Sequence, residues 1–184
     1  MAADHKVALS ELSTVLDLVD PESLEIACNM IARAKNILLY GCGREGLQMQ
    51  GLAMRLYHLG CNACMVGAMN APPLGAGDVF IVSAGPGELA TVTALMNVAR
   101  RDGAKIVFLT ATPDTEASAL ADHVVYIPAQ TMANDQGGAA RSVLPMGSLY
   151  EGALFVLFEM LVLDLRDGKG VDAQDMRARH TNME

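Results

Sequence analysis

Short apolar runs alternate along this chain with longer segments of helical periodicity. Five runs have the length and the flanking turn residues of buried strands, at residues 36–41, 63–66, 78–83, 105–110 and 123–127. Three segments between them have the apolar spacing of helices, at residues 45–59, 88–102 and 115–121. Because strands that alternate with helices pair in parallel, the pattern predicts a parallel sheet with helices on both faces.

Further helices are expected at both ends of the chain. Asp20 and Pro21 form a helix start, with Asp as N-cap and Pro at the first helical position, and a shorter helix is expected near residues 7–18. The last helix is apolar on nearly every face, which predicts that it is buried on all sides. The tail from Asp167 onward is polar and is expected to fray. We therefore expect one domain over residues 1–184, with N-terminal helices at about 8–33, a sheet core at 36–128, a loop at 129–147 and a C-terminal helix at 148–166.

Composition and charge narrow the classes of protein. Hydrophobic residues make up 52 % of the chain and charged residues 18 %, which excludes a disordered protein and predicts an apolar oligomer interface. The formal net charge of -8, with no basic run, argues against nucleic acid as a partner. The longest apolar run, residues 153–163, is interrupted by Glu159 and is shorter than the ~20 residues of a membrane span.

The four cysteines favour a reducing, cytoplasmic setting. The N-terminal segment Met-Ala-Ala-Asp-His-Lys lacks the apolar core of a secretory leader. Cys61 and Cys64 have C-x-x-C spacing, but no second pair or suitably spaced histidines accompany them. We interpret these cysteines as structural, and we expect neither a metal nor a cofactor.

Two glycine-rich turns follow predicted strands, where doubly wound sheets bind ligands. The turn at residues 41–46 has the glycines of a dinucleotide site but lacks the acidic partner of that fingerprint. The loop at residues 83–89 would present backbone N–H groups and a positive helix end to an anion. However, Ala84, Pro86 and Leu89 stand where hydroxyl groups would complete an anion site, and Pro86 has no N–H to donate.

Four strings of residues resemble the SIS (sugar isomerase) domain family, and within it the 6-phospho-3-hexuloisomerases. They are Gly41-x-Gly43-Arg44-x-Gly46, Met54-Arg55-Leu56-x-His58-Leu59-Gly60, Gly85-x-Gly87-Glu88 and Pro145-Met146-Gly147-Ser148-Leu149-x-Glu151. The resemblance implies an α/β fold, a three-layer α-β-α sandwich with a five-stranded parallel sheet of flavodoxin-like type. It also implies an isomerase of sugars or sugar phosphates that forms homodimers or homotetramers with sites near subunit interfaces.

The resemblance further implies that Glu151 is the catalytic base and that His58 reaches a neighbouring subunit's site. A carboxylate and an imidazole suit the two proton transfers of an enediolate mechanism near neutral pH. Each residue also has a structural interpretation: Ser148-x-x-Glu151 is a possible capping box, and His58 lies in a last helical turn that favours a cation. Arg44 could steer an anion or be solvated, and Arg141, in the loop before Pro145, could close over a bound sugar or be solvated.

The chain departs from this family where the family holds phosphate. Glu45, Ala84, Pro86 and Leu89 replace the hydroxyl residues of the family's phosphate loops. Three functions remain open: an isomerase of a phosphorylated sugar, an isomerase of an unphosphorylated or amino-bearing sugar, and a non-catalytic sugar-binding module. The expected substrate-binding residues are Gly43, Arg44, Glu45, Ser83, Ala84, Gly85, Gly87, Glu88, Leu89 and Arg141.

Overall fold

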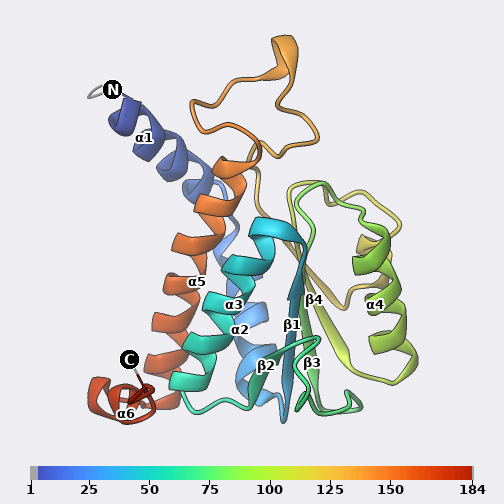
Figure 1. Ribbon diagram of the computed structural model, residues 1–184, viewed down its shortest axis with the longest axis vertical. Helices are drawn as coiled ribbons and strands as arrows, with labels where there is room; N and C mark the ends of the chain where they lie inside the picture. The colour runs from blue at the N-terminus through green and yellow to red at the C-terminus, as the bar shows by residue number, and fades with distance from the viewer. Residues whose placement is uncertain (1–3, 184) are drawn as a thin grey trace.

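The computed structural model describes residues 4–183 of the chain. Five parallel strands form one sheet in the order β2-β1-β3-β4-β5 (Figure 1). The strands are β1 (Ile37–Gly41), β2 (Ala63–Met65), β3 (Val79–Ser83), β4 (Lys105–Thr110) and β5 (His123–Tyr126). This is the flavodoxin-like order, in which the chain switches direction between β1 and β3. The predicted fold class is confirmed. Residues 1–3 and 184 belong to the expected domain but lie outside the described residues.

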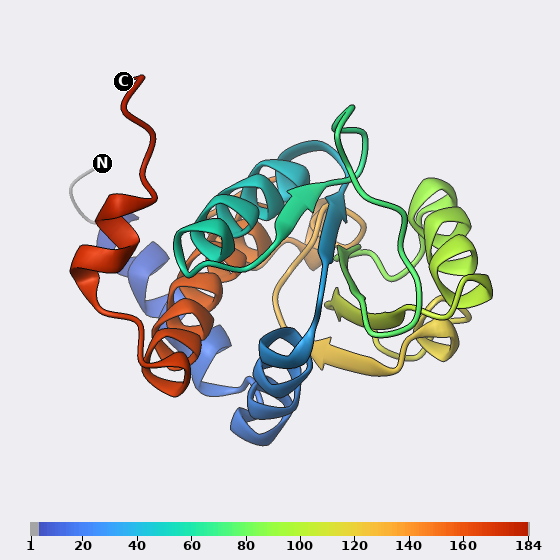
Figure 2. The same ribbon diagram turned by 90° about the horizontal axis from the view of Figure 1, so that it is seen from below.

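Helices cover both faces of the sheet. α1 (Asp4–Asp17), α2 (Pro21–Arg33), α3 (Gly43–His58) and α5 (Ser148–Lys169) lie on one side, and α4 (Ala90–Arg101) lies on the other (Figures 1 and 2). Alternate residues of β3 enter separate cores: Val79 and Ile81 pack with the larger layer, whereas Phe80 and Val82 pack with α4. Because both faces are covered, the strand is apolar from Val79 to Val82, as the sequence predicted.

Three predicted elements differ in the structure. The helix expected at 115–121 is one 3-10 turn, Ser118–Leu120, where the Thr115 hydroxyl accepts a hydrogen bond from the Ser118 N–H at 3.3 Å. Such local hydroxyl bonds compete with a regular helix. The helix expected to start at Glu88 starts at Ala90. The tail expected to fray instead contains the end of α5 and α6 (Ala173–Ala178), which a capping box of Asp172 and Asp175 starts.

The prediction that the last helix is buried on all sides is wrong for the single chain. Phe155 is 60 % exposed and Met160 46 % exposed, although the opposite face of α5 is buried against α1, α2 and α3. The apolar residues therefore form two faces, one inside the domain and one on its surface. Within residues 4–183, no helix is long and apolar enough to cross a membrane.

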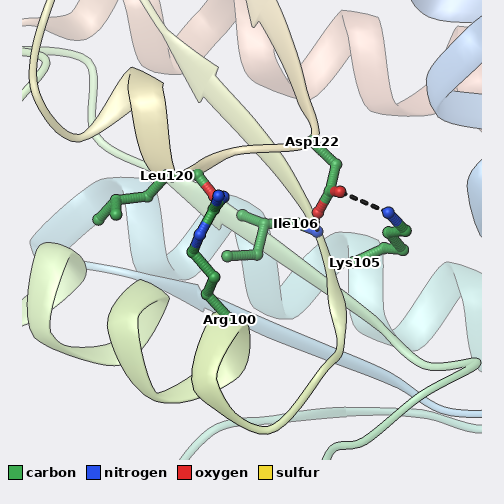
Figure 3. Close-up of polar contacts among 5 residues, drawn as sticks. All are labelled: Arg100, Lys105, Ile106, Leu120 and Asp122. Carbon is green, nitrogen blue, oxygen red and sulfur yellow. Dashed lines mark hydrogen bonds and ion pairs between the residues drawn. The ribbon is translucent and has the colours of Figure 1, made fainter.

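Asp122 joins the segment before β5 to the start of β4 (Figure 3). Its carboxylate accepts hydrogen bonds from Lys105 Nζ at 2.6 Å and from the Ile106 N–H at 2.9 Å. Nearby, Arg100 Nη1 donates to the Leu120 carbonyl at 3.0 Å. Partial burial opposes ionisation of Asp122, but the bonds from Lys105 and Ile106 outweigh it and lower the pKa of the carboxyl below 3.8.

We expect Asp122→Asn to destabilise the protein by about 1 kcal/mol at pH 7, because a partly exposed charged hydrogen-bond pair is lost. A carboxyl whose pKa is lower in the folded than in the unfolded protein stabilises the fold. This stabilisation is complete when pH is above the unfolded pKa, and it disappears as pH falls through the folded pKa. In urea unfolding, the difference from wild type should therefore shrink as pH falls below the unfolded pKa of about 3.9, and it should vanish once the pH lies below the lowered folded pKa. Asp102→Asn, at a more exposed ion pair with Arg101, is the control. An equal loss in both variants, or a loss independent of pH, would contradict this assignment.

Candidate active site

A cavity of about 380 Å³ lies beyond the carboxyl ends of β1 and β3, at the point where the strand order reverses. Its walls come from the turn after β1, the loop after β3, residues 131–132 and the start of α5. α3 and α5 pack side by side on one face of the sheet, and their first turns lie at the end of the sheet where β1 finishes (Figure 1). The lining residues are Cys42, Gly43, Arg44, Glu45, Pro86, Leu89, Thr131, Met132, Met146, Gly147, Tyr150 and Glu151.

Glu45 reaches from the first turn of α3 to the loop after β3. Its carboxylate accepts a hydrogen bond from Ser83 Oγ at 2.5 Å, and both carboxylate oxygens lie 3.1 Å from the Gly85 backbone nitrogen. Burial raises the pKa of Glu45, and the bonds from Ser83 and Gly85 counter part of this rise. The anion-binding groups of the loop are thus held by a side chain of the same chain.

Tyr150 completes this network from α5. Its hydroxyl lies 3.1 Å from Ser83 Oγ, and both side chains are almost completely buried. Burial first, and then the charge of Glu45, raise the pKa of Tyr150 well above 10. A Cβ on Gly85 would lie 2.9 Å from the Tyr150 ring, so the close approach of the loop requires glycine. Tyr150 is not among the predicted site residues, although its position beside Glu151 in the predicted helix start was the available signal.

Glu151 faces the cavity from the first turn of α5. Its carboxylate lies 3.0 Å from Arg44 Nε, and its side chain is 15 % exposed. Burial raises the pKa of Glu151, the Arg44 charge lowers it, and the Glu45 charge raises it; the net direction is upward. A carboxyl whose pKa is raised in a cavity is suited to general acid-base chemistry.

The capping-box interpretation of Glu151 is wrong. α5 begins after Gly147, which has φ 80° and is the N-cap residue, so Ser148 is already inside the helix. Ser148 Oγ accepts a hydrogen bond from Arg44 Nη1 at 3.0 Å, and Arg44 also donates to the Met146 carbonyl. Arg44 therefore joins the start of α3 to the start of α5 and is not simply solvated. Met146, at φ 56°, is the one described non-glycine residue with positive φ.

The structure brings only part of the predicted binding set to the cavity. Gly43, Arg44, Glu45 and Leu89 line it, and Ser83 and Gly85 reach it through Glu45. The remaining residues of the loop point elsewhere: the Ala84 N–H donates to the Leu109 carbonyl, the Gly87 N–H to the Ala84 carbonyl, and the Glu88 carboxylate accepts from the Glu116 N–H.

Arg141 lies at a different cavity, of about 710 Å³, beside α1 and the end of β5. This space is larger than the one at Glu151. Its polar side chains mainly bond to the surrounding loop: Gln130 Oε1 accepts from the Arg141 and Ser142 N–H groups, and Glu11 accepts from Ser142 Oγ at 2.5 Å. The smaller cavity is the candidate active site because it lies at the strand switch and is lined by the two carboxylates with raised pKa.

His58 lies far from Glu151 within one chain. It occupies the last turn of α3, roughly 20 Å along the helix from Glu45 at 1.5 Å per residue. Its ring is 6 % exposed and stacks on His180, with centroids 5.2 Å apart, and Arg179 Nη1 donates to the His58 carbonyl at 3.2 Å. To reach a second subunit's site, His58 would need the C-terminal segment to move away.

Among the described residues, no group of three or more His, Cys, Asp or Glu side chains is arranged to hold a metal ion. The four cysteines are unpaired. The interpretation of Cys61 and Cys64 as structural residues remains a prediction, with burial raising the pKa of both thiols.

Comparison with known proteins identifies the family. The model of the SIS domain matches residues 30–156, so the chain belongs to the SIS domain family. It is 33 % identical to a 3-hexulose-6-phosphate isomerase from Mycobacterium gastri, over 95 % of this chain and 86 % of the relative. It is 31 % identical to a 3-hexulose-6-phosphate isomerase from Bacillus subtilis (strain 168), over 96 % of this chain and 95 % of the relative.

A solved structure has the same fold. One crystal structure of a hypothetical protein superimposes with a TM-score of 0.88 and 26 % identity, covering 97 % of this chain and 94 % of that one. The resemblance inferred from the four sequence strings is confirmed.

Proposed function

We propose that the chain is a sugar isomerase that moves a carbonyl group between neighbouring carbons through an enediolate, with Glu151 as the base. The arrangement of Glu151 in the cavity, 3.0 Å from Arg44, carries this proposal. The similarity to 3-hexulose-6-phosphate isomerases over nearly the whole chain supports a ketohexose skeleton as the substrate.

Glu151 and Arg44 divide the chemistry between them. The carboxylate of Glu151 removes the proton from the hydroxyl-bearing carbon beside the carbonyl and returns it to the former carbonyl carbon. The proton of that hydroxyl group passes to the former carbonyl oxygen, so the product is an isomer of the substrate with the carbonyl on the neighbouring carbon. Negative charge develops on the enediolate oxygens, and the adjacent guanidinium of Arg44 stabilises it. His58 remains a predicted second catalytic group, although its buried position in one chain gives no support to that role.

A non-catalytic sugar-binding module has less support as an alternative, because such a module would not need a carboxylate of raised pKa beside a cation in the cavity.

The state of the cysteines supports the cytoplasmic assignment. Secreted proteins usually pair their cysteines, whereas all four are free here.

We also propose that the chain forms a homodimer or homotetramer through the exposed surface of α3 and α5. Leu47 is 59 % exposed, Met54 50 % and Phe155 60 %, and Met54 and Phe155 border one shallow groove between the helices. Arg55 and Glu159 form a two-pronged ion pair in this groove, at 3.0 and 2.9 Å. Leu47 lies two residues after Glu45 on α3, and Phe155 lies four residues, about one turn, after Glu151 on α5, which would place the active site near the subunit interface.

Glu151→Gln tests the proposed base. We expect kcat to fall by about 10²- to 10⁴-fold with little change in KM, because the amide cannot take up the substrate proton. Turnover and exchange of the substrate C–H with deuterium from solvent should be followed with a panel of ketohexoses and their 6-phosphates. Glu22→Gln, on the exposed surface of α2, is the matched control. Undiminished deuterium exchange in Glu151→Gln would refute the assignment.

Arg44→Gln tests the electrostatic link between the two groups. A catalytic base must be ionised, so activity disappears as pH falls through the pKa of Glu151. Since Arg44 lowers that pKa, its removal should move the acid limb of kcat/KM to higher pH. Arg33→Gln, on α2, should leave the limb in place. If the acid limb of kcat/KM is unchanged in Arg44→Gln, Arg44 does not influence the pKa of the catalytic base.

Phe155→Glu tests the proposed interface. A charge buried in an apolar contact is strongly unfavourable, so the variant should shift the molar mass in light scattering towards that of one chain. Met69→Glu, at a methionine that is 98 % exposed in a turn, should leave the mass unchanged. If wild type and Phe155→Glu have the same mass, the subunits associate through another surface or do not associate.

A further inference from the structure

The groups at the start of the loop after β3 that could donate to an anionic ligand are already engaged. The Gly85 N–H and the Ser83 hydroxyl both donate to Glu45. Pro86 has no N–H, and the Gly87 N–H donates to the Ala84 carbonyl at 2.9 Å. The carboxylate of Glu45 therefore occupies the position that this glycine turn would offer to an incoming anion.

The charges around the cavity also oppose an anion. Two carboxylates, Glu45 and Glu151, border it, and the nearby guanidinium of Arg44 already pairs with Glu151 at 3.0 Å. A phosphate group next to Glu45 would place two like charges in a partly buried space. Such a pair is costly unless one partner takes up a proton or moves away.

Glu45 keeps capacity for a ligand that donates hydrogen bonds. A carboxylate offers about four acceptor positions, and the Ser83 hydroxyl and the shared Gly85 N–H use only part of them. Glu45 also borders the cavity, so a donor in that space can reach its carboxylate. A sugar hydroxyl is such a donor, whereas an ionised phosphate is mainly an acceptor.

We infer that Glu45 is a specificity-determining residue: its carboxylate replaces a substrate phosphate at the Gly85 loop and selects a sugar that presents a hydroxyl group there. This inference rests on the proposed function for the identity of the ligand as a sugar. It departs from the phosphorylated substrate in the names of the isomerase relatives and assigns this chain an unphosphorylated one.

The inference is tested by binding rather than turnover. Inorganic phosphate, fructose 6-phosphate and fructose would be titrated by calorimetry, at constant ionic strength, into wild type, Glu45→Ser and Glu45→Gln. Glu45→Ser frees the Gly85 N–H and adds a hydroxyl, so its affinity for inorganic phosphate and fructose 6-phosphate should exceed that of wild type at least tenfold. Glu45→Gln removes the charge but keeps the side-chain shape, so a smaller gain is expected. Glu25→Ser, on the exposed face of α2, changes the net charge equally and should give no gain.

Several results would overturn the inference. Micromolar binding of fructose 6-phosphate by wild type is one, and weaker phosphate binding in Glu45→Ser than in wild type is another. If Glu45→Ser does not fold, the proposal is tested by comparing Glu45→Gln with wild type. If Glu45→Gln then binds phosphate no more tightly than wild type, the proposal is refuted. A wild type that isomerises a sugar phosphate with micromolar KM would refute the selectivity and leave the isomerase proposal intact. Conversely, a phosphate gain in Glu45→Ser without any isomerase activity would support the role of Glu45 and refute the proposed function.

Discussion

The hydrogen bonds from Ser83 and Gly85 to the Glu45 carboxylate are the interaction on which the site depends. They join the start of α3 to the loop after β3, two segments that meet only because β1 and β3 are neighbours in the sheet. Tyr150 extends the same network to α5. One buried carboxylate thereby fixes three elements around a single cavity and sets the charge that a ligand meets there.

Arg44 forms a second link between α3 and α5, and this link also contributes to the proposed chemistry. It holds Ser148 and the carboxylate of Glu151, so the proposed base is positioned by a group that also stabilises negative charge. The two carboxylates raise each other's cost of ionisation, yet only Glu151 pairs with Arg44. This asymmetry supports different roles: proton transfer for Glu151 and ligand selection for Glu45.

Sequence periodicity predicted the sheet well because the inner strands are covered on both faces and are therefore mainly apolar, as β3 shows. It failed at residues 115–121, where short-range hydroxyl bonds replace a helix, and at α5, where apolar residues occupy an exposed face as well as a buried one. The sequence identified Glu45 as a departure from a phosphate site. It could not show that Glu45 fills the loop itself, because that contact spans two turns that only the strand order brings together.

The central claim is that the protein supplies its own anion at the Gly85 loop. A crystal structure of wild type grown with saturating fructose 6-phosphate tests it most directly. The account predicts that Glu45 stays bonded to the Gly85 N–H and Ser83 Oγ, with no phosphate density at the loop. Phosphate oxygens on the Gly85 N–H, with the Glu45 side chain displaced, would contradict it.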